Sequence, residues 1–206
     1  MTTFVDEIMS DIDWRISELA SIKMIPIKYN FNNDHKNIHI KYSVPAIYSI
    51  WEGFIKSCFV IYSNHLNTLS IKRTDIAVPL LTHQLDSECD FNNSRTNFDA
   101  KQKLVLLMDG LFNDVIVIKP SVPTESNVNY KVLTKILERF CIDPIDESYD
   151  KGLNKLLRFR NIIAHGENSI TVDIAHIIEF VALVENLMLD ILINIEKCEK
   201  AKSYHK

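Results

Sequence analysis

The stretch KGLNKLLRFRNIIAH, which runs from Lys151 to His165, carries the pattern that decides the fold. On a helix, with about 100° per residue, its apolar residues gather on one broad face. These are Leu153, Leu156, Leu157, Phe159, Ile163 and Ala164. The spacing predicts an amphipathic helix that packs this face against a core. A basic stripe on the opposite face leads to His165, and Arg160 stands within the apolar face.

Helical spacing of apolar residues recurs along most of the 206 residues, which include only four glycines and six prolines. Short links between consecutive helices favour antiparallel neighbours. We therefore predict the all-α class, with an up-and-down helical bundle. The predicted helices span residues 3–23, 43–69, 75–84, 98–112, 129–142, 151–165 and 171–200.

Prolines and polar residues set the predicted ends of the first two helices. Pro26 marks the end of the first helix, while Ser43 caps the second and Pro45 fits its first turn. The asparagine-rich segment between them, residues 27–42, is expected to be a loop or a short hairpin.

The helical pattern weakens in the middle third, residues 72–128. Within it, residues 86–97 are expected to form a loop, and residues 114–120 form either a strand or the end of the preceding helix. We interpret this third as a helical or irregular insertion in a single domain that spans residues 1–206.

Composition limits the class of protein. A hydrophobic content of 47% is enough for a continuous core. No run of about 18 uncharged apolar residues is present, and the N-terminal stretch MTTFVDEIMSDIDW is acidic where a signal peptide needs a basic flank. We expect a cytoplasmic protein that does not engage a membrane. The net charge of −4 means that any contact with nucleic acid must come from a local basic patch.

Metal, disulfide and cofactor sites are not expected. The four cysteines form no CxxC pair, and His35 and His39 form an HxxxH without an evident third ligand. The glycine-rich and serine signatures of common nucleotide-binding proteins and hydrolases, GxxxxGK[ST], GxGxxG and GxSxG, are absent from the sequence.

Arg160 is costly among apolar positions unless a carboxylate, a phosphate or another subunit meets its guanidinium. The foremost candidate partner is Glu52, which lies in the apolar run IYSIWEGFIKSCFVIY. Glu138, Asp146 and Glu185 are further candidates. The alternative is that Arg160 lies at a helix edge and extends its charged end to solvent.

The residues from Arg160 to Gly166 form RN-x-x-AHG at the end of the predicted helix. In this feature the chain resembles the HEPN superfamily (higher eukaryotes and prokaryotes nucleotide-binding), whose RNA-cutting members carry an arginine, four to six residues and then a histidine. A polar residue usually follows that arginine, as Asn161 does here. The stretch IWEGFIKS, residues 50–57, is similar to the Trp-Glu-Gly signature of one bacterial HEPN group, and the lead from NYKVLTKILERFCI into the motif is similar as well.

The resemblance covers about residues 44–67 and 127–197 and implies several family properties. It implies a bundle of four or five helices and a homodimer whose two motifs face each other across the interface. It also implies metal-independent endoribonuclease activity, with RNA as the substrate and with an antitoxin or a defence-system protein as a partner. Family members act as toxins or as effectors of defence against phage. Other members have lost the activity and serve as binding or assembly domains.

The chemistry assigns roles to the motif residues. Cleavage without a metal uses the 2′-hydroxyl of RNA as the nucleophile, which requires a group that transfers protons near neutral pH and a cation for the charge on the phosphate. His165 fits the first role and Arg160 the second. Asn161, four residues before His165, can orient the imidazole or the phosphate. The alternative for His165 is a terminal residue that only satisfies helix carbonyls.

Supporting roles fall to four further residues. Glu52 is expected to hold Arg160, or else to be a partly solvated glutamate at a helix edge. Arg158, Lys155 and Lys151 are expected to guide the RNA backbone toward the site. Three hypotheses remain open from the sequence: a dimeric ribonuclease, a catalytically inactive HEPN domain used for binding or assembly, and an unrelated helical bundle with a chance motif.

Overall fold

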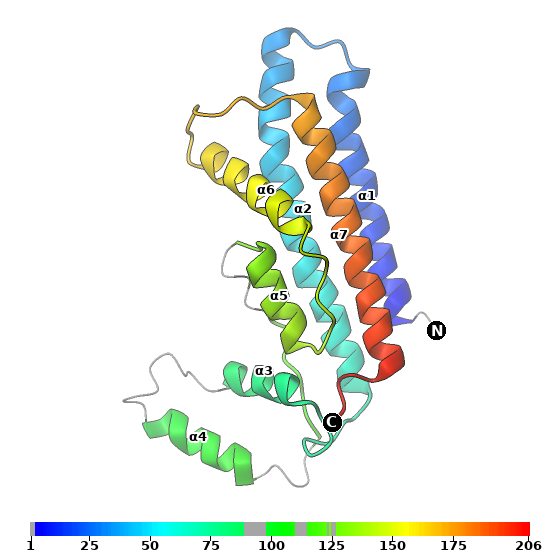
Figure 1. The fold of residues 1–206 in the computed structure, drawn as a ribbon, viewed down its shortest axis with the longest axis vertical. Coiled ribbons are helices and arrows are strands. Elements are labelled where there is room, and N and C mark those ends of the chain that lie inside the picture. Colours follow the sequence, from blue (N-terminus) through cyan, green and yellow to red (C-terminus); the bar gives the residue numbers. More distant parts are fainter. Residues whose placement is uncertain (1–2, 89–97, 110–114, 123, 125–126) are drawn as a thin grey trace.

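The computed structural model describes residues 3–88, 98–109, 115–122, 124 and 127–206. Figure 1 shows three long helices, α1, α2 and α7, side by side along the body, with α6 crossing beside α2 and with α3 and α4 toward one end. The prediction of an all-α helical bundle is confirmed. The helices are α1 (Phe4–Lys28), α2 (Asn33–Thr68), α3 (Val78–Glu88), α4 (Phe98–Asp109), α5 (Tyr130–Arg139), α6 (Tyr149–Ala164) and α7 (Ile174–Ala201).

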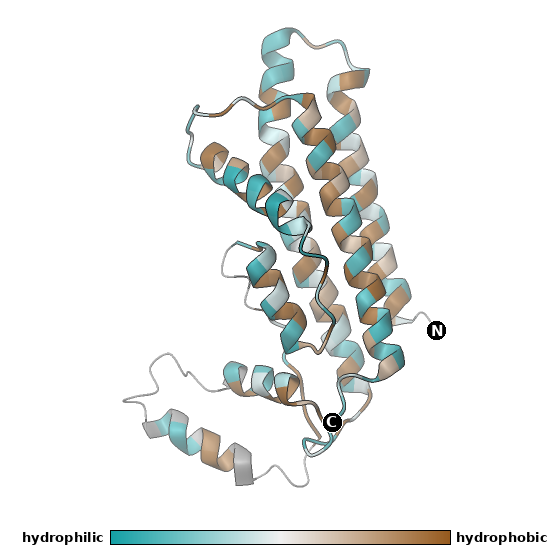
Figure 2. Cartoon of the chain, in the orientation of Figure 1, coloured by the Kyte–Doolittle hydropathy of each residue, from teal (hydrophilic) through white to brown (hydrophobic). Residues whose placement is uncertain are grey.

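Helix α2 forms the centre of the core, because it packs against α1, α6 and α7. Its buried aromatic side chains include Tyr48, Trp51, Phe54, Phe59 and Tyr62. Burial of one such side chain contributes about 1.5 to 3 kcal/mol. Figure 2 shows apolar and hydrophilic residues alternating as the long helices turn, as expected for helices with one buried side.

Helix α1 begins with a capping box, in which the Thr3 hydroxyl accepts from the Asp6 N–H and the Asp6 carboxylate accepts from the Thr3 N–H. It does not end before Pro26, as predicted, but continues to Lys28. Proline lacks the N–H that would reach the carbonyl four residues earlier. That carbonyl, of Ile22, lies 3.4 Å from His39 Nε2 on the neighbouring helix. A tertiary contact therefore helps α1 to continue through its proline.

The prediction for residues 27–42 was wrong, since only residues 29–32 connect α1 and α2. Asn32 caps α2 by accepting from the His35 N–H at 2.8 Å, so the helix starts ten residues before Ser43. Ser43 and Pro45 lie inside the helix, where the Ser43 hydroxyl donates to the His39 carbonyl. An asparagine-rich segment was interpreted as a loop, although one of its asparagines is the cap.

The boundaries in the middle third also differ from prediction. Residues 75–77 are not helical, because the Ala77 N–H donates to the Tyr204 carbonyl and the Lys206 N–H donates to the Asp75 carbonyl. Helix α3 therefore starts at Val78 and includes residues 86–88 of the predicted loop. The rest of that loop, residues 89–97, and the predicted end of the next helix, residues 110–112, lie outside the described residues.

Residues 115–120 form neither a full strand nor a helix end. Val115 makes a single antiparallel bridge with Lys72, and the side-chain amide of Asn67 pairs with both the N–H and the carbonyl of Ile118 at 2.7 and 3.0 Å. The chain thus returns next to the C-terminal end of α2, from which it departed. The interpretation of residues 72–128 as an insertion stays a prediction.

Helix α5 ends at Arg139, three residues before the predicted end. Cys141 takes a left-handed conformation with φ of 58°, and the Ile142 N–H donates to the Leu137 carbonyl. This is the usual C-terminal turn of a helix, but with cysteine where glycine is common. The sequence offered no glycine to mark the end.

By length and composition, α2 is also the one described helix that is apolar enough to cross a membrane, with a mean hydropathy of 1.3 in its most apolar window. Half of that window is buried inside the bundle. A central core helix has the same property.

A buried arginine joins α1 to α2. Arg15 forms an ion pair with Asp11 at 3.0 Å and donates to the Ile50 carbonyl at 2.9 Å and to the Ser57 hydroxyl at 3.2 Å. A Cβ on Gly53 would lie 3.0 Å from Arg15 Nη1. The absence of a side chain at Gly53 therefore gives the guanidinium its place against α2.

We predict that Arg15→Leu lowers the free energy of unfolding by about 3 kcal/mol, because it leaves the partly buried Asp11 carboxylate without its cation. Lys56→Met, which breaks a pair with a solvent-exposed lysine, is the control and should cost under about 1 kcal/mol. Urea unfolding followed by circular dichroism measures both. Equal losses would show that the Arg15 cluster does not hold the helices together.

Candidate functional site

Arg160 is half-buried on α6 and is met by an aromatic ring and two amide oxygens. Its guanidinium carbon lies 4.6 Å from the centre of the Tyr48 ring on α2. Its Nη1 donates to Asn161 Oδ1 at 2.8 Å and to Asn127 Oδ1 at 3.3 Å. The ring face and the oxygens carry partial negative charge, so they stabilise the cation without neutralising it.

The predicted pair between Glu52 and Arg160 is not formed. Glu52 accepts from Lys56, one turn along α2, at 2.6 Å. None of the ion pairs in the described part of the chain joins Arg160 to Glu138, Asp146 or Glu185. The sequence required a partner for the charge, but the partner is Tyr48, one turn before Glu52.

Tyr48 stays neutral in this position. Burial raises the pKa of its phenol above the usual range and the nearby Glu52 carboxylate adds to the rise, while the hydrogen bond from Val128 and the Arg160 charge oppose it. The neutral hydroxyl accepts a hydrogen bond from the Val128 N–H at 2.7 Å. Tyr48 therefore binds Arg160 with its ring and the chain before α5 with its hydroxyl.

The segment that carries Asn127 is bound to α2 through the backbone N–H and the backbone carbonyl of Val128. Its N–H donates to Tyr48, and its carbonyl accepts from Trp51 Nε1 at 3.0 Å. Because Val128 is held in this way, Asn127 is placed against the guanidinium of Arg160. In the Trp-Glu-Gly stretch, Trp51 thus positions this segment, Glu52 pairs with Lys56, and Gly53 admits Arg15.

His165 is the C-cap residue of α6, and it is exposed. Gly166 follows with φ of 76°, and the N–H groups of Gly166 and Glu167 donate to the carbonyls of Ile163 and Ile162 at 3.0 Å. Backbone groups therefore satisfy these terminal carbonyls. The alternative role for the His165 ring, as a cap of these carbonyls, gains no support from this geometry.

Arg160 and His165 point to different sides of α6. Five residues apart on a helix, they are separated by about 140°. The Oδ1 of Asn161 accepts from the guanidinium of Arg160, and among the described residues no hydrogen bond joins the Asn161 amide to the His165 ring. The structure thus brings Arg160 and Asn161 together, while His165 stands at the exposed end of the same helix.

The basic stripe of α6 is only partly available to a ligand. Lys155 pairs with Glu179 at 2.6 Å and lies 5.8 Å from the ring centre of Phe180. This pair matches the charge of Lys155, and its role in guiding RNA stays a prediction. Arg158 and Lys151 are exposed and enter no ion pair among the described residues.

Sequence reasoning missed Tyr48, Asn127 and Val128. Tyr48 belongs to the apolar side of α2 and is 1% exposed, so it read as ordinary core. Asn127 and Val128 stand at the end of the middle third, where no periodic pattern places them. One signal was available for Tyr48, since it lies four residues before Glu52 and therefore on the same side of the helix.

In the described part of the chain, no three His, Cys, Asp or Glu side chains are grouped to hold a metal ion. His35 and His39 do share one helix, contrary to the expectation for that segment. His39 is engaged by the Ile22 carbonyl and by the ring of Phe31, whose centre is 6.1 Å away.

These features define an all-helical domain with an arginine held by a tyrosine ring and two asparagine side chains, and with a histidine at the exposed end of the same helix. The chain belongs to the HEPN superfamily: a family model described as MAE_28990-like HEPN matches residues 4–204. The match includes the first helix and the middle third, which the sequence motifs left unaccounted for. No curated protein and no solved structure matches the chain significantly. HEPN domains are often ribonucleases or nucleotide-binding proteins.

We predict different losses from two substitutions on the same side of α2. Tyr48→Leu should lower the free energy of unfolding by about 2 to 4 kcal/mol, because it removes the ring beneath Arg160 and leaves the Val128 N–H unpaired. Glu52→Gln should cost under about 1 kcal/mol, since its partner Lys56 is exposed. Denaturant unfolding measures both. A larger loss for Glu52→Gln would identify the glutamate as the residue that holds Arg160.

Proposed function

We propose that this HEPN protein is a metal-independent endoribonuclease whose site contains Arg160, Asn161 and His165. The observation that carries the proposal is the arrangement around Arg160. Both hydrogen bonds that its guanidinium makes within the described residues use Nη1, so Nε and Nη2 have no protein partner there. Such free donors suit two oxygens of a phosphate.

Neutral partners preserve the charge that this role needs. A carboxylate would cancel the positive charge of Arg160, whereas Tyr48, Asn127 and Asn161 fix the guanidinium and leave its charge intact. In a half-buried site such a fixed cation stabilises the charge that develops on phosphate oxygens in the transition state.

The reaction proceeds by proton transfer and attack within the RNA itself. A base removes the proton of a 2′-hydroxyl, and that oxygen attacks the adjacent phosphorus. The bond from phosphorus to the 5′-oxygen breaks, and this oxygen takes up a proton. The products are a 2′,3′-cyclic phosphate and a 5′-hydroxyl. His165 is the proton-transfer group, because an imidazole can both accept and donate a proton and its exposed position admits RNA.

A homodimer supplies the remaining geometry. In one copy, Arg160 lies against α2 and His165 lies at the exposed end of α6. The two side chains of a single copy therefore do not face the same phosphate. Two copies that associate near the C-terminal end of α6 bring Arg160 of one copy toward His165 of the other. In the cell we propose a cytoplasmic toxin or phage-defence effector, restrained by an antitoxin or a defence-system protein.

Purified protein should cut single-stranded RNA in the presence of EDTA and leave 2′,3′-cyclic phosphate and 5′-hydroxyl ends. His165→Ala should lower the rate at least about 100-fold, which is the typical contribution of one positioned acid or base. Arg160→Lys should also lower the rate strongly, because lysine keeps the charge but loses the two-pronged contact. Gel analysis with end-group labelling measures the products and rates.

Ile193→Ala on the exposed surface of α7 is the control and should cut RNA as the wild type does. Cleavage by the His165→Ala variant at the wild-type rate, with equal folded protein, would reject the assignment. No cleavage by the wild type would favour the second candidate, an inactive HEPN domain for binding or assembly, which the net charge of −4 also suits. Slow bacterial growth on expression, relieved by His165→Ala, would support the toxin role.

The composite site gives a complementation prediction. Arg160→Ala and His165→Ala proteins are each expected to be inactive, but their mixed dimers hold one copy with an intact His165 and one with an intact Arg160. Subunit exchange between the two variants should therefore restore part of the cleavage activity. Light scattering establishes the dimer first. Stable mixed dimers without activity, or a monomeric wild type at micromolar concentration, would exclude a site shared in this way.

A further inference from the structure

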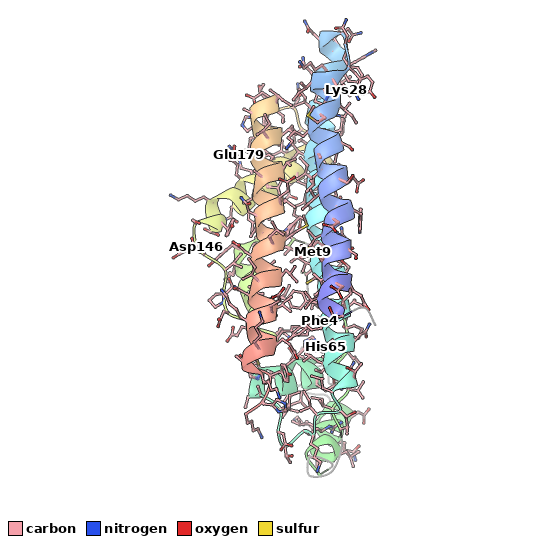
Figure 3. All side chains as sticks on the ribbon, turned by 90° about the vertical axis from the view of Figure 1, so that its right-hand side faces the viewer. Phe4, Met9, Lys28, His65, Asp146 and Glu179 are labelled. Carbon is pink, nitrogen blue, oxygen red and sulfur yellow. The ribbon has the colours of Figure 1, made fainter. Side chains whose placement is uncertain are left out.

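One end of the bundle combines exposed aromatic residues with lysines that form no ion pair within the described part of the chain. This region, the α1–α2 tip, comprises residues 23–42, from the last turns of α1 to the first turns of α2. It extends past the start of α7 in Figure 1, and Figure 3 shows Lys28 at this end, beyond Glu179. Five large apolar or aromatic residues are exposed on it: Met24, Ile27, Tyr29, Ile38 and Tyr42.

The two tyrosines present flat rings to solvent. Tyr29 is 57% exposed and Tyr42 is 60% exposed. Tyr29 also stands at the end of a row of rings, with its centre 6.3 Å from that of Phe31, which lies 6.1 Å from that of His39. Exposed rings of this kind are platforms on which unstacked bases bind.

The charge of the tip is opposite to that of the whole chain. Four lysines and one aspartate give it +3, with histidines neutral, whereas the chain carries −4. None of these lysines enters an ion pair among the described residues. Lys41 donates to neutral oxygens, and Lys28 lies 6.0 Å from the ring centre of Tyr29. The lysines are Lys23, Lys28, Lys36 and Lys41.

The tip is joined to the chain that follows His165. Lys41 Nζ donates to Asn168 Oδ1 at 3.2 Å and lies 3.5 Å from the Glu167 carbonyl. Tyr42 lies six residues before Tyr48 on α2, which is about 9 Å along the helix axis. Tyr42 is also turned by about 120° around the helix from Tyr48, so a nucleic-acid strand held at Arg160 that follows the surface of α2 reaches the tip within a few nucleotides.

We propose that the α1–α2 tip binds single-stranded RNA that extends from the cleavage site, with bases stacked on Tyr42 and Tyr29 and with phosphates near the lysines. The proposal rests on the ribonuclease function, for which it supplies the missing basic patch. Charge complementarity selects a polyanion, and the exposed rings select unpaired bases over a duplex. The tip explains how an acidic protein holds RNA.

Binding is tested with a fluorescein-labelled 12-nucleotide RNA in which 2′-O-methyl groups prevent cleavage, followed by anisotropy. Tyr42→Ala should weaken binding at least about 5-fold, the loss expected for one stacked base, while Tyr42→Phe should bind within about 2-fold of wild type. Lys28→Gln should lower the dependence of affinity on salt by about one phosphate contact. Ile193→Ala, at a residue of α7 that is 49% exposed, is the control.

Kinetics separate this proposal from the ribonuclease assignment. With a cleavable 12-nucleotide RNA, Tyr42→Ala should raise KM and leave kcat within about 2-fold, and with a dinucleotide it should change neither. Cleavage by the wild type with equal RNA binding by Tyr42→Ala and Tyr42→Phe would overturn the tip proposal alone. Tyr42-dependent binding without cleavage would overturn the ribonuclease assignment and retain an RNA-binding tip.

Two further measurements test the other ligands that a basic aromatic patch could bind, namely a membrane surface and a second copy of the chain. Vesicles of phosphatidylserine and phosphatidylcholine that float with the wild type but not with Tyr42→Ala, while RNA affinity is unchanged, would assign the tip to a membrane surface. Light scattering that shows a dimer for the wild type and a monomer for Tyr42→Ala would assign it to contact between copies. Either result would overturn the RNA proposal.

Discussion

A single positive charge on the apolar face of α6 constrains much of this structure. Arg160 cannot be buried there without partners, because the loss of hydration would cost several kcal/mol. The bundle supplies the ring of Tyr48 and the amide oxygens of Asn127 and Asn161. Each comes from a different part of the chain, so satisfaction of one guanidinium fixes α2, α6 and the start of α5 relative to one another.

The choice of neutral partners has a chemical consequence. A salt bridge to Glu52 would have stabilised Arg160 but left little net charge for a ligand. Instead Glu52 pairs with Lys56, and burial raises the pKa of the Tyr48 phenol further above its ordinary value, so the phenol adds no negative charge. Tyr48, Asn127 and Asn161 thus hold the guanidinium in place and preserve its charge, which is the combination that phosphate binding requires.

Two helices with different surroundings meet the requirements of the proposed site. Helix α2 buries one side of its central turns in the core and gives Arg160 a base there, while most residues of its first turns are exposed, as is Tyr42. Helix α6 stops abruptly at His165, because Gly166 takes a left-handed conformation. The same bundle therefore presents a fixed cation, an exposed imidazole and a basic aromatic tip in neighbouring places.

The sequence by itself determined the features that depend on neighbours within a turn or two. It predicted the all-α class, the two faces of α6, its end near His165 and Gly166, and the core position of α2, because periodicity and caps are local. Family membership also followed from short motifs. Asn32 carried a local cap signal too, but the asparagines around it led to the interpretation of that segment as a loop.

Only the tertiary structure decided which groups meet. The partner of Arg160 is an aromatic ring on another helix, the carbonyl freed by Pro26 is reached by His39, and residues 75–77 pair with the C-terminal residues in place of a helical turn. Lys155 likewise finds Glu179 on α7. These contacts join segments distant in sequence, and their energies depend on burial and direction, which spacing along one chain does not contain.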